Sequence, residues 1–365
     1  MVAIGKLSYS WYLWHWPLLA FSRILAPGNG SLARALAVAF GALVLAAVTF
    51  IFVENPIRQR RPWPLFGVYP TLAVGAAISL MVALLAVALE RQADAATRRD
   101  PWLGAIAAAA RTIPAKPGCN FAGAFTALAP AAECAVGAPG VPPRILVWGD
   151  SQAEQLKAMM TADGARGAYA AAIWSKSDCP PLVPASSRRP NAASACLAFN
   201  RAVAAELPAL AQAGLGGIVL ASRYFGFPGA WSPLDELAAW RAGLQDILST
   251  ARGLNIRVVL IAPIPMFRLP LPECLAHGSA AQCGASRANF ERGHAPLLAA
   301  LGEIVKGYDD VRIWDPADLL CDASLCTPMR DGTIMYSDRG HLSVLGAQAL
   351  AADAAPQLDW LRGQR

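Results

Sequence analysis

The sequence predicts an α/β domain, a parallel sheet flanked by helices, that follows about three transmembrane helices. Three observations support this fold class. The 365-residue chain is 55% hydrophobic and 15% charged, with a mean hydropathy of +0.38, and its apolar excess lies in the first 90 residues. After residue 144, short apolar runs rich in β-formers alternate with helical segments. A Gly-Asp-Ser tripeptide stands where the first of these runs ends.

Residues 4–25, 32–53 and 68–89 are each long enough to cross a bilayer, which takes roughly 20 residues in a helix. The first stretch holds a cluster of Trp and Tyr typical of a membrane interface. A buried core helix is the alternative for this stretch, because it also carries polar groups. We interpret one of them, His15, as a structural group rather than a catalytic one.

The loop between the second and third expected spans carries three close arginines, Arg58, Arg60 and Arg61. Such a cluster marks the cytoplasmic side, so the third span should deliver the rest of the chain to the outer side. We therefore divide the chain into a membrane segment (1–90), a linker and lead-in rich in Ala, Pro and Gly (91–143), and an extracytoplasmic domain (144–365).

All eight cysteines lie beyond the third expected span and fall into four pairs that are close in sequence. The pairs are Cys119 and Cys134, Cys179 and Cys196, Cys274 and Cys283, and Cys321 and Cys326. An even count of this kind indicates disulfides in an oxidising compartment. A zinc site is the alternative, but there is no Cys-x-x-Cys, and Cys274-x-x-His277 is isolated, so we expect no metal.

Alternating strands and helices are legible through the third segment. We expect strands at 145–148, 217–222, 256–262 and 311–314, and helices at 152–160, 201–213, 234–252 and 344–354. This alternation predicts a parallel sheet covered on both faces, with the functional site at the carboxyl ends of the strands.

Ser151 follows the first expected strand and precedes a helix, which suits a nucleophile, although a plain N-cap turn is the alternative. Near the C-terminus, Asp338 and His341 lie three residues apart, so the carboxylate can orient the imidazole as a general base. Asp150 competes for the orienting role, and Asp338 could instead cap the last helix. The remaining candidate bases, His277 and His294, are expected to be solvated.

Gly149-Asp150-Ser151 together with Asp338-x-x-His341-Leu-Ser resembles the SGNH (GDSL-like) hydrolase superfamily. More narrowly, it resembles the SGNH domain fused behind acyltransferase family 3 membrane proteins, which O-acetylate bacterial surface glycans. Residues 4–17 and 52–58 resemble late helices of that membrane domain. The resemblance therefore implies that only its last helices are present, and that the rest lies in another chain or that this chain is a fragment.

The resemblance also implies where a developing oxyanion is bound. SGNH proteins add a glycine N–H and an asparagine side chain to the N–H of the nucleophile, and this chain lacks both. At the matching positions, the candidates for oxyanion binding are the side chain of Arg223 and the backbone N–H of Ser175 or Ser177. Arg223 could equally form a salt bridge at the end of its strand. Four aromatic residues in the next loop could stack on a sugar or simply pack: Tyr224, Phe225, Phe227 and Trp231.

These features predict a membrane-anchored periplasmic O-acyltransferase in the bacterial inner membrane. Ser151 would take an acyl group, acetyl by resemblance and ultimately from acetyl-CoA, and pass it to a surface polysaccharide such as lipopolysaccharide. No bound cofactor is expected, the missing membrane domain is a possible partner, and the net charge of +6 does not indicate nucleic acid. A carbohydrate acetyl esterase with the same triad and a noncatalytic glycan-binding module are the alternatives.

Overall fold

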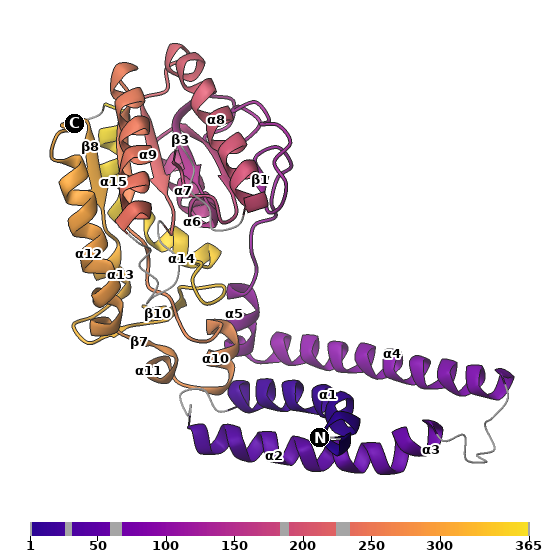
Figure 1. Ribbon diagram of the computed structural model, residues 1–365. Coiled ribbons are helices and arrows are strands. Elements are labelled where there is room, and N and C mark those ends of the chain that lie inside the picture. Colours follow the sequence, from indigo (N-terminus) through magenta and orange to yellow (C-terminus); the bar gives the residue numbers. More distant parts are fainter. Residues whose placement is uncertain (1, 26–30, 59–67, 183–189, 224–233, 364–365) are drawn as a thin grey trace. The chain divides into compact units, whose positions relative to one another are not determined.

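The computed structural model describes residues 2–25, 31–58, 68–182, 190–223 and 234–363 (Figure 1). The chain divides into two compact units. The first comprises Met1–Ala108 and Glu273–Cys283, and the second comprises Ala109–Pro272 and Gly284–Arg365.

The first unit is helical. Its helices are α1 (Val2–Leu25), α2 (Leu32–Thr49), α3 (Asn55–Arg58), α4 (Val68–Arg99) and α5 (Pro101–Ala109), with a π-helical turn at Phe50–Glu54, and the short helices α10 (Leu271–His277) and α11 (Ala280–Cys283). Helix α4 extends to Arg99, so the first residues of the expected linker are helical.

Among the described residues, two helical segments are long and apolar enough to cross a membrane, Leu32–Ile57 and Tyr69–Arg99. They correspond to the second and third expected spans. The first expected span, residues 4–25, forms helix α1 but does not meet the same standard. Its serines, its histidine and the polar ring atoms of its Trp and Tyr cluster lower its hydropathy.

Polar side chains join helix α1 to α2 and to the π-helical turn that follows α2. The hydroxyl of Ser10 donates to the carboxylate of Glu54 at 2.7 Å, and the indole N–H of Trp14 donates to Thr49 at 2.9 Å. His15 is held within its own helix, where Nδ1 lies 3.0 Å from the carbonyl oxygen of Trp11. This contact agrees with a structural role for the imidazole.

The second unit is built on a seven-stranded sheet in the order β1-β4-β3-β5-β6-β8, with β2 paired to β4. The strands are β1 (Asn120–Phe121), β2 (Ala135–Gly137), β3 (Pro143–Gly149), β4 (Ala170–Lys176), β5 (Gly217–Ala221), β6 (Arg257–Ile261) and β8 (Val311–Trp314). All pairings are parallel except that of β2 with β4. The predicted α/β fold with a parallel sheet is confirmed.

Helices cover both faces of this sheet (Figure 1). The larger helices are α7 (Lys157–Arg166), α8 (Pro190–Gln212), α9 (Leu234–Gly253), α12 (Arg287–Val305), α14 (Val344–Ala349) and α15 (Ala351–Leu361), and the short ones are α6 (Ser151–Glu154) and α13 (Ala317–Leu320). Two small two-stranded antiparallel sheets complete the unit, β7 (Ala285–Ser286) with β9 (Leu325–Cys326) and β10 (Met329–Arg330) with β11 (Thr333–Ile334).

Strand β3 lies in the middle of the sheet and is buried on both faces. Ile145, Leu146, Val147 and Trp148 have no exposed surface, which explains why this run is continuously apolar instead of alternating. The chain crosses from β3 to β4 on one side and later returns to β5 on the other. The carboxyl ends of β3 and β5 therefore flank a topological switch point, where α/β proteins place their sites.

Four disulfides form, and they are the four pairs expected from sequence proximity. Cys119–Cys134 connects the strands β1 and β2, both of which lie in the expected lead-in. This part of the chain therefore contributes two strands to the main sheet. Strand β4 is also an addition, since residues 170–176 were not among the four expected strands. Alanine, which dominates its first half, is a weak β-former.

A glycine is required where β3 ends. A Cβ atom added at Gly149 would lie 1.8 Å from the carbonyl oxygen of Ala221 in β5. We expect Gly149→Ala to destabilise the protein by at least about 2 kcal/mol, because the backbone of β5 could move away from the new Cβ only by disrupting its strand pairing. Thermal unfolding of the full chain in detergent measures this change.

Gly302→Ala in α12 is the matched control, since no atom lies within 4 Å of its added Cβ. This variant should gain about 0.5–1 kcal/mol from helix propensity. Equal shifts in unfolding temperature for the two variants would contradict the proposed strand contact.

Candidate active site

Ser151 lies in the turn from β3 into α6, and Asp150 fixes this turn. One oxygen of Asp150 accepts the backbone N–H of Gln152 at 2.8 Å. The other accepts the Ser222 hydroxyl at 2.7 Å and the backbone N–H of Arg223 at 3.0 Å, both at the end of β5. Burial raises the pKa of Asp150, and these hydrogen bonds and the Arg223 charge oppose that rise. Since both oxygens are occupied, Asp150 anchors the turn to β5 and is not the partner of the imidazole.

The structure brings Ser151, His341 and Asp338 into one hydrogen-bonded chain. Nε2 of His341 lies 2.7 Å from Oγ of Ser151, and Nδ1 lies 2.7 Å from Oδ2 of Asp338. The other oxygen of Asp338 accepts the backbone N–H groups of Gly340 at 2.7 Å and of His341 at 2.8 Å. Partial burial alone would raise the pKa of Asp338, but these hydrogen bonds and the imidazole charge hold it at about 2. Asp338 therefore stays ionised at any physiological pH.

The loop that carries His341 is closed on itself. The backbone N–H of Ser337 donates to the carbonyl oxygen of His341 at 2.9 Å. The helix that follows is capped by Ser343, whose side chain accepts the N–H of Gly346 at 2.9 Å. The alternative that Asp338 caps this helix is therefore excluded, and its carboxylate serves the loop and the imidazole.

Two glutamines hold this loop against the nucleophile turn. The side chain of Gln152 donates to the carbonyl oxygen of Gly340 at 2.9 Å, and Gln155 accepts the backbone N–H of Leu342 at 2.6 Å. The two side chains also bond to each other at 2.7 Å. Neither glutamine was predicted to belong to the site. Their spacing of three residues directly after Ser151 is the one sequence feature that indicates such a role, because it places both side chains on the same side of a helical segment.

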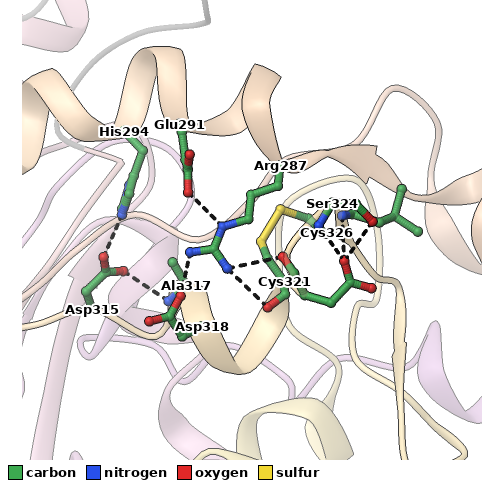
Figure 2. Close-up of a disulfide and its surroundings, with 11 residues drawn as sticks. Arg287, Glu291, His294, Asp315, Ala317, Asp318, Cys321, Ser324 and Cys326 are labelled. Carbon is green, nitrogen blue, oxygen red and sulfur yellow. Dashed lines mark hydrogen bonds and ion pairs between the residues drawn. A yellow bond between two sulfur atoms is a disulfide. The ribbon is translucent and has the colours of Figure 1, made fainter.

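A second His–Asp pair exists in the domain, and no hydroxyl or thiol group of the described residues bonds to its imidazole. His294 on α12 lies 2.8 Å from the carboxylate of Asp315, which follows β8 (Figure 2). Its ring stacks on that of Phe290, with the ring centroids 4.4 Å apart. Its exposed fraction is 6%, so the expectation that His294 is solvated is wrong. The pair connects α12 to the end of β8 beside the disulfide Cys321–Cys326. His277 is exposed, as expected.

Of the backbone N–H groups considered for oxyanion binding, those of Ser175 and Ser177 are excluded and that of Ser151 remains. The N–H of Ser175 donates to the carbonyl oxygen of Cys119 at 3.0 Å, and that of Ser177 donates to Phe121 at 2.8 Å. Both groups are engaged in pairing with β1, contrary to the expectation that one of them is free for an oxyanion. The N–H of Ser151 begins α6 and has no such acceptor in the described part of the chain, which leaves it available.

Arg223 lies close to the histidine loop. A Cβ atom added at Gly340 would lie 3.6 Å from Nη2 of Arg223, so the guanidinium group is adjacent to the residue before His341. The four aromatic residues Tyr224, Phe225, Phe227 and Trp231 lie outside the described residues. Within the described residues, no group of three or more potential metal ligands is found.

A cavity of about 290 Å³ opens beside the triad. Ser151 and His341 line it, together with Glu154 on α6 and the segment 111–115 that precedes β1. Glu154 was not among the expected site residues. Burial raises the pKa of its carboxyl group, while the charges of Lys157 and His341 and a hydrogen bond from Ser175 lower it. The cavity gives a ligand direct access to the Ser151 hydroxyl.

This arrangement has the elements of nucleophilic acyl chemistry. A hydroxyl group is hydrogen-bonded to an imidazole, and an ionised carboxylate fixes the orientation of that imidazole. The side chain of His341 is 28% exposed, so a substrate can reach it.

Comparison with known proteins identifies the family of the domain. Residues 118–356 match the family described as "SGNH domain (fused to AT3 domains)". The chain belongs to this family. The match does not extend to the membrane segment, so the likeness of residues 4–17 and 52–58 to acyltransferase family 3 stays a prediction.

Several solved structures resemble this SGNH-domain protein, among them the following two. No curated protein matches it. One is the periplasmic domain of a lipopolysaccharide acetyltransferase from Salmonella ser. Paratyphi A, with 14% identity, a TM-score of 0.44, and coverage of 59% of this chain and 84% of that chain. The other is a carbohydrate esterase family 2 enzyme with a carbohydrate-binding domain from Corynascus thermopiles, with 13% identity, a TM-score of 0.35, and coverage of 62% and 68%.

Ser151 should react with a fluorophosphonate probe, and Asp338→Asn should slow this labelling on the order of 10³–10⁴-fold. The amide cannot hold the imidazole in the tautomer that accepts the serine proton. The rate of adduct formation, followed by peptide mass spectrometry on the full chain, measures the effect.

Asp331→Asn is the control, because this carboxylate is 93% exposed and lies in the β10–β11 turn. It should label at the wild-type rate. Unchanged labelling of the Asp338 variant would show that this carboxylate does not orient the base.

Proposed function

We propose that this protein is a membrane-anchored O-acyltransferase that transfers an acyl group, acetyl by family resemblance, to a hydroxyl group of a bacterial surface polysaccharide. The observation that carries the proposal is the chain of hydrogen bonds from Asp338 through His341 to Ser151 beside an open cavity. Membership of a family of SGNH domains fused to AT3 domains supports acyl chemistry over other uses of the same triad.

In the first half-reaction, Oγ of Ser151 attacks the carbonyl carbon of the acyl donor while Nε2 of His341 accepts its proton. The tetrahedral intermediate carries an oxyanion, for which the N–H of Ser151 and the guanidinium of Arg223 are the candidate donors. The intermediate collapses as the bond to the leaving group of the donor breaks and that group takes the proton from His341. An acyl ester of Ser151 remains.

In the second half-reaction, a hydroxyl group of the polysaccharide attacks this ester, and His341 takes the hydroxyl proton. Collapse returns the proton to Ser151 and releases the acylated polysaccharide. Asp338 remains a carboxylate throughout and stabilises the imidazolium, in keeping with its pKa of about 2. The acyl donor, ultimately acetyl-CoA, would be supplied across the membrane by the acyltransferase helices or by another chain.

We place the second unit in the periplasm and the apolar helices in the bacterial inner membrane. Four disulfides favour an oxidising compartment. Arg58, Arg60 and Arg61 precede the apolar segment Tyr69–Arg99, so the rule that basic loops are cytoplasmic puts the following residues outside. This orientation depends on that one segment and does not require α1 to span the bilayer.

An acetyl esterase is the second candidate, favoured by the partial exposure of His341, which lets water reach the acyl ester. The two functions share the first half-reaction and differ in the acceptor. The ratio of transfer to hydrolysis, measured with and without a glycan, decides between them.

The full chain in detergent should gain one acetyl group on Ser151 during brief exposure to p-nitrophenyl acetate. Peptide mass spectrometry locates the adduct, and Ser151→Ala should abolish it, since among the described residues the Ser151 hydroxyl is the one bonded to the imidazole of His341. Thermal unfolding serves as the folding control for the variant. Acetylation that persists in the alanine variant, or none in the wild type, would overturn the proposed function.

A further inference from the structure

Glu154 places a carboxylate beside the nucleophile. It lies three residues after Ser151 on the same short helix and lines the same cavity as Ser151 and His341. Residues three apart on a helix share a face, so the two side chains are neighbours at the cavity wall. The proposed acyl transfer gives this carboxylate no role, although keeping it partly buried costs free energy of desolvation.

Three groups of the described residues stabilise the charged form of this carboxylate and lower its pKa against the effect of burial. They are the charges of Lys157 and His341 and a hydrogen bond from the Ser175 side chain. That hydroxyl is aligned by Asn120, whose amide donates to Ser175 Oγ at 2.9 Å and so leaves the hydroxyl proton for Glu154. Lys157 instead donates to the carbonyl oxygen of Pro114 at 3.3 Å and to the Asn120 side chain at 3.4 Å.

An ionised carboxylate can accept about four hydrogen bonds, so acceptor positions remain on the cavity side of Glu154. A ligand that fills them must bring hydroxyl or N–H donors. The charge of Glu154 repels phosphate and carboxylate groups, although Arg111 lines another part of the cavity. Beside Glu154 itself, the chemistry therefore favours a neutral polyol over an anionic acyl donor.

The rest of the cavity fits a sugar ring. Its volume of about 290 Å³ lies near the lower end of the range for small-molecule sites. Apolar side chains that can cover the C–H face of a ring make up much of its lining: Ile113, Pro114, Ala115, Ala158 and Val344. Arg111, Thr112 and Ser337 also line the cavity. Apolar wall area combined with a few polar groups that fix orientation is typical of small-molecule recognition.

We propose that the cavity is the acceptor subsite and that Glu154 binds a hydroxyl group of the acceptor sugar, so that a neighbouring hydroxyl is presented to His341 and the Ser151 ester. This inference rests on the proposed acyl transfer and deepens it. Glu154 is thereby a specificity-determining residue: it favours a sugar over water in the second half-reaction without taking part in the first.

The test separates the two half-reactions in the full chain. p-Nitrophenyl acetate acylates Ser151, and the acetyl group then partitions between water, methanol and a set of methyl glycosides (glucoside, galactoside, mannoside and rhamnoside). Glu154→Gln should lower kcat/KM for transfer to the preferred glycoside by about tenfold or more, because a charge-assisted hydrogen bond is lost. Acylation, hydrolysis and transfer to methanol should change less than about twofold.

Ala115→Trp, at an exposed position of the cavity wall, provides a second variant that fills the subsite and keeps the carboxylate. It should cause the same selective loss of glycoside transfer. Glu206→Gln on α8, an exposed carboxylate, is the matched control and should behave as the wild type.

Each outcome decides the question. Glycoside transfer that is unchanged in Glu154→Gln, or no faster than methanol transfer in the wild type, overturns the subsite while the proposed function stands. An equal loss of acylation shows that Glu154 supports the triad and also overturns the subsite. Failure of the wild type to acylate Ser151 removes the proposed function itself.

Discussion

The hydrogen bond between Nε2 of His341 and Oγ of Ser151 joins two loops that are 190 residues apart in the sequence, and the active site depends on it. A bond of this length tolerates little movement of either loop. Gln152 and Gln155 supply that restraint, since both reach from the nucleophile turn to the backbone of the histidine loop. His341 is thus positioned by the side-chain amides of Gln152 and Gln155, which bond to the backbone of its loop, and by the carboxylate of Asp338. The sheet fixes the start of the nucleophile turn, because that turn follows β3 directly.

Two aspartates near the site have opposite surroundings and separate tasks. Asp150 is 5% exposed and binds donors from the nucleophile turn and from the end of β5, so it holds two strand ends together. Asp338 is half-exposed, and its donors all come from its own loop. Burial raises the pKa of the first carboxyl group, whereas at the second the hydrogen bonds and the imidazole charge together outweigh burial and lower the pKa. Asp338, which must stay charged beside the imidazole of His341, is therefore the carboxylate whose donors lie within a few residues of it in the sequence.

The sequence could predict what depends on local pattern. The apolar strands, the cysteine pairs and the Asp-x-x-His spacing each involve residues close in the chain. Strand β4 was missed because its alanines carry little β signal, although tertiary pairing on both sides makes it a strand. His294 was misjudged because its partner, Asp315, lies 21 residues away after another strand. Gln152, Gln155 and Glu154 could not be recognised, since a helix-forming polar residue gains a role only when a distant loop or a cavity wall meets it.

The division between catalysis and selectivity follows from where these elements lie. A triad that forms an acyl ester is indifferent to the acceptor, because His341 can activate water or a sugar hydroxyl in the same way. Preference must then come from surfaces that bind one acceptor before the ester is attacked. In the proposed subsite those surfaces are helix α6 and the segment 111–115. From its composition, this segment was predicted to belong to the linker and lead-in. The lead-in therefore contributes β1 and β2 to the sheet and residues 111–115 to the cavity wall. A segment whose sequence shows no clear helical or strand periodicity thus borders the proposed acceptor subsite.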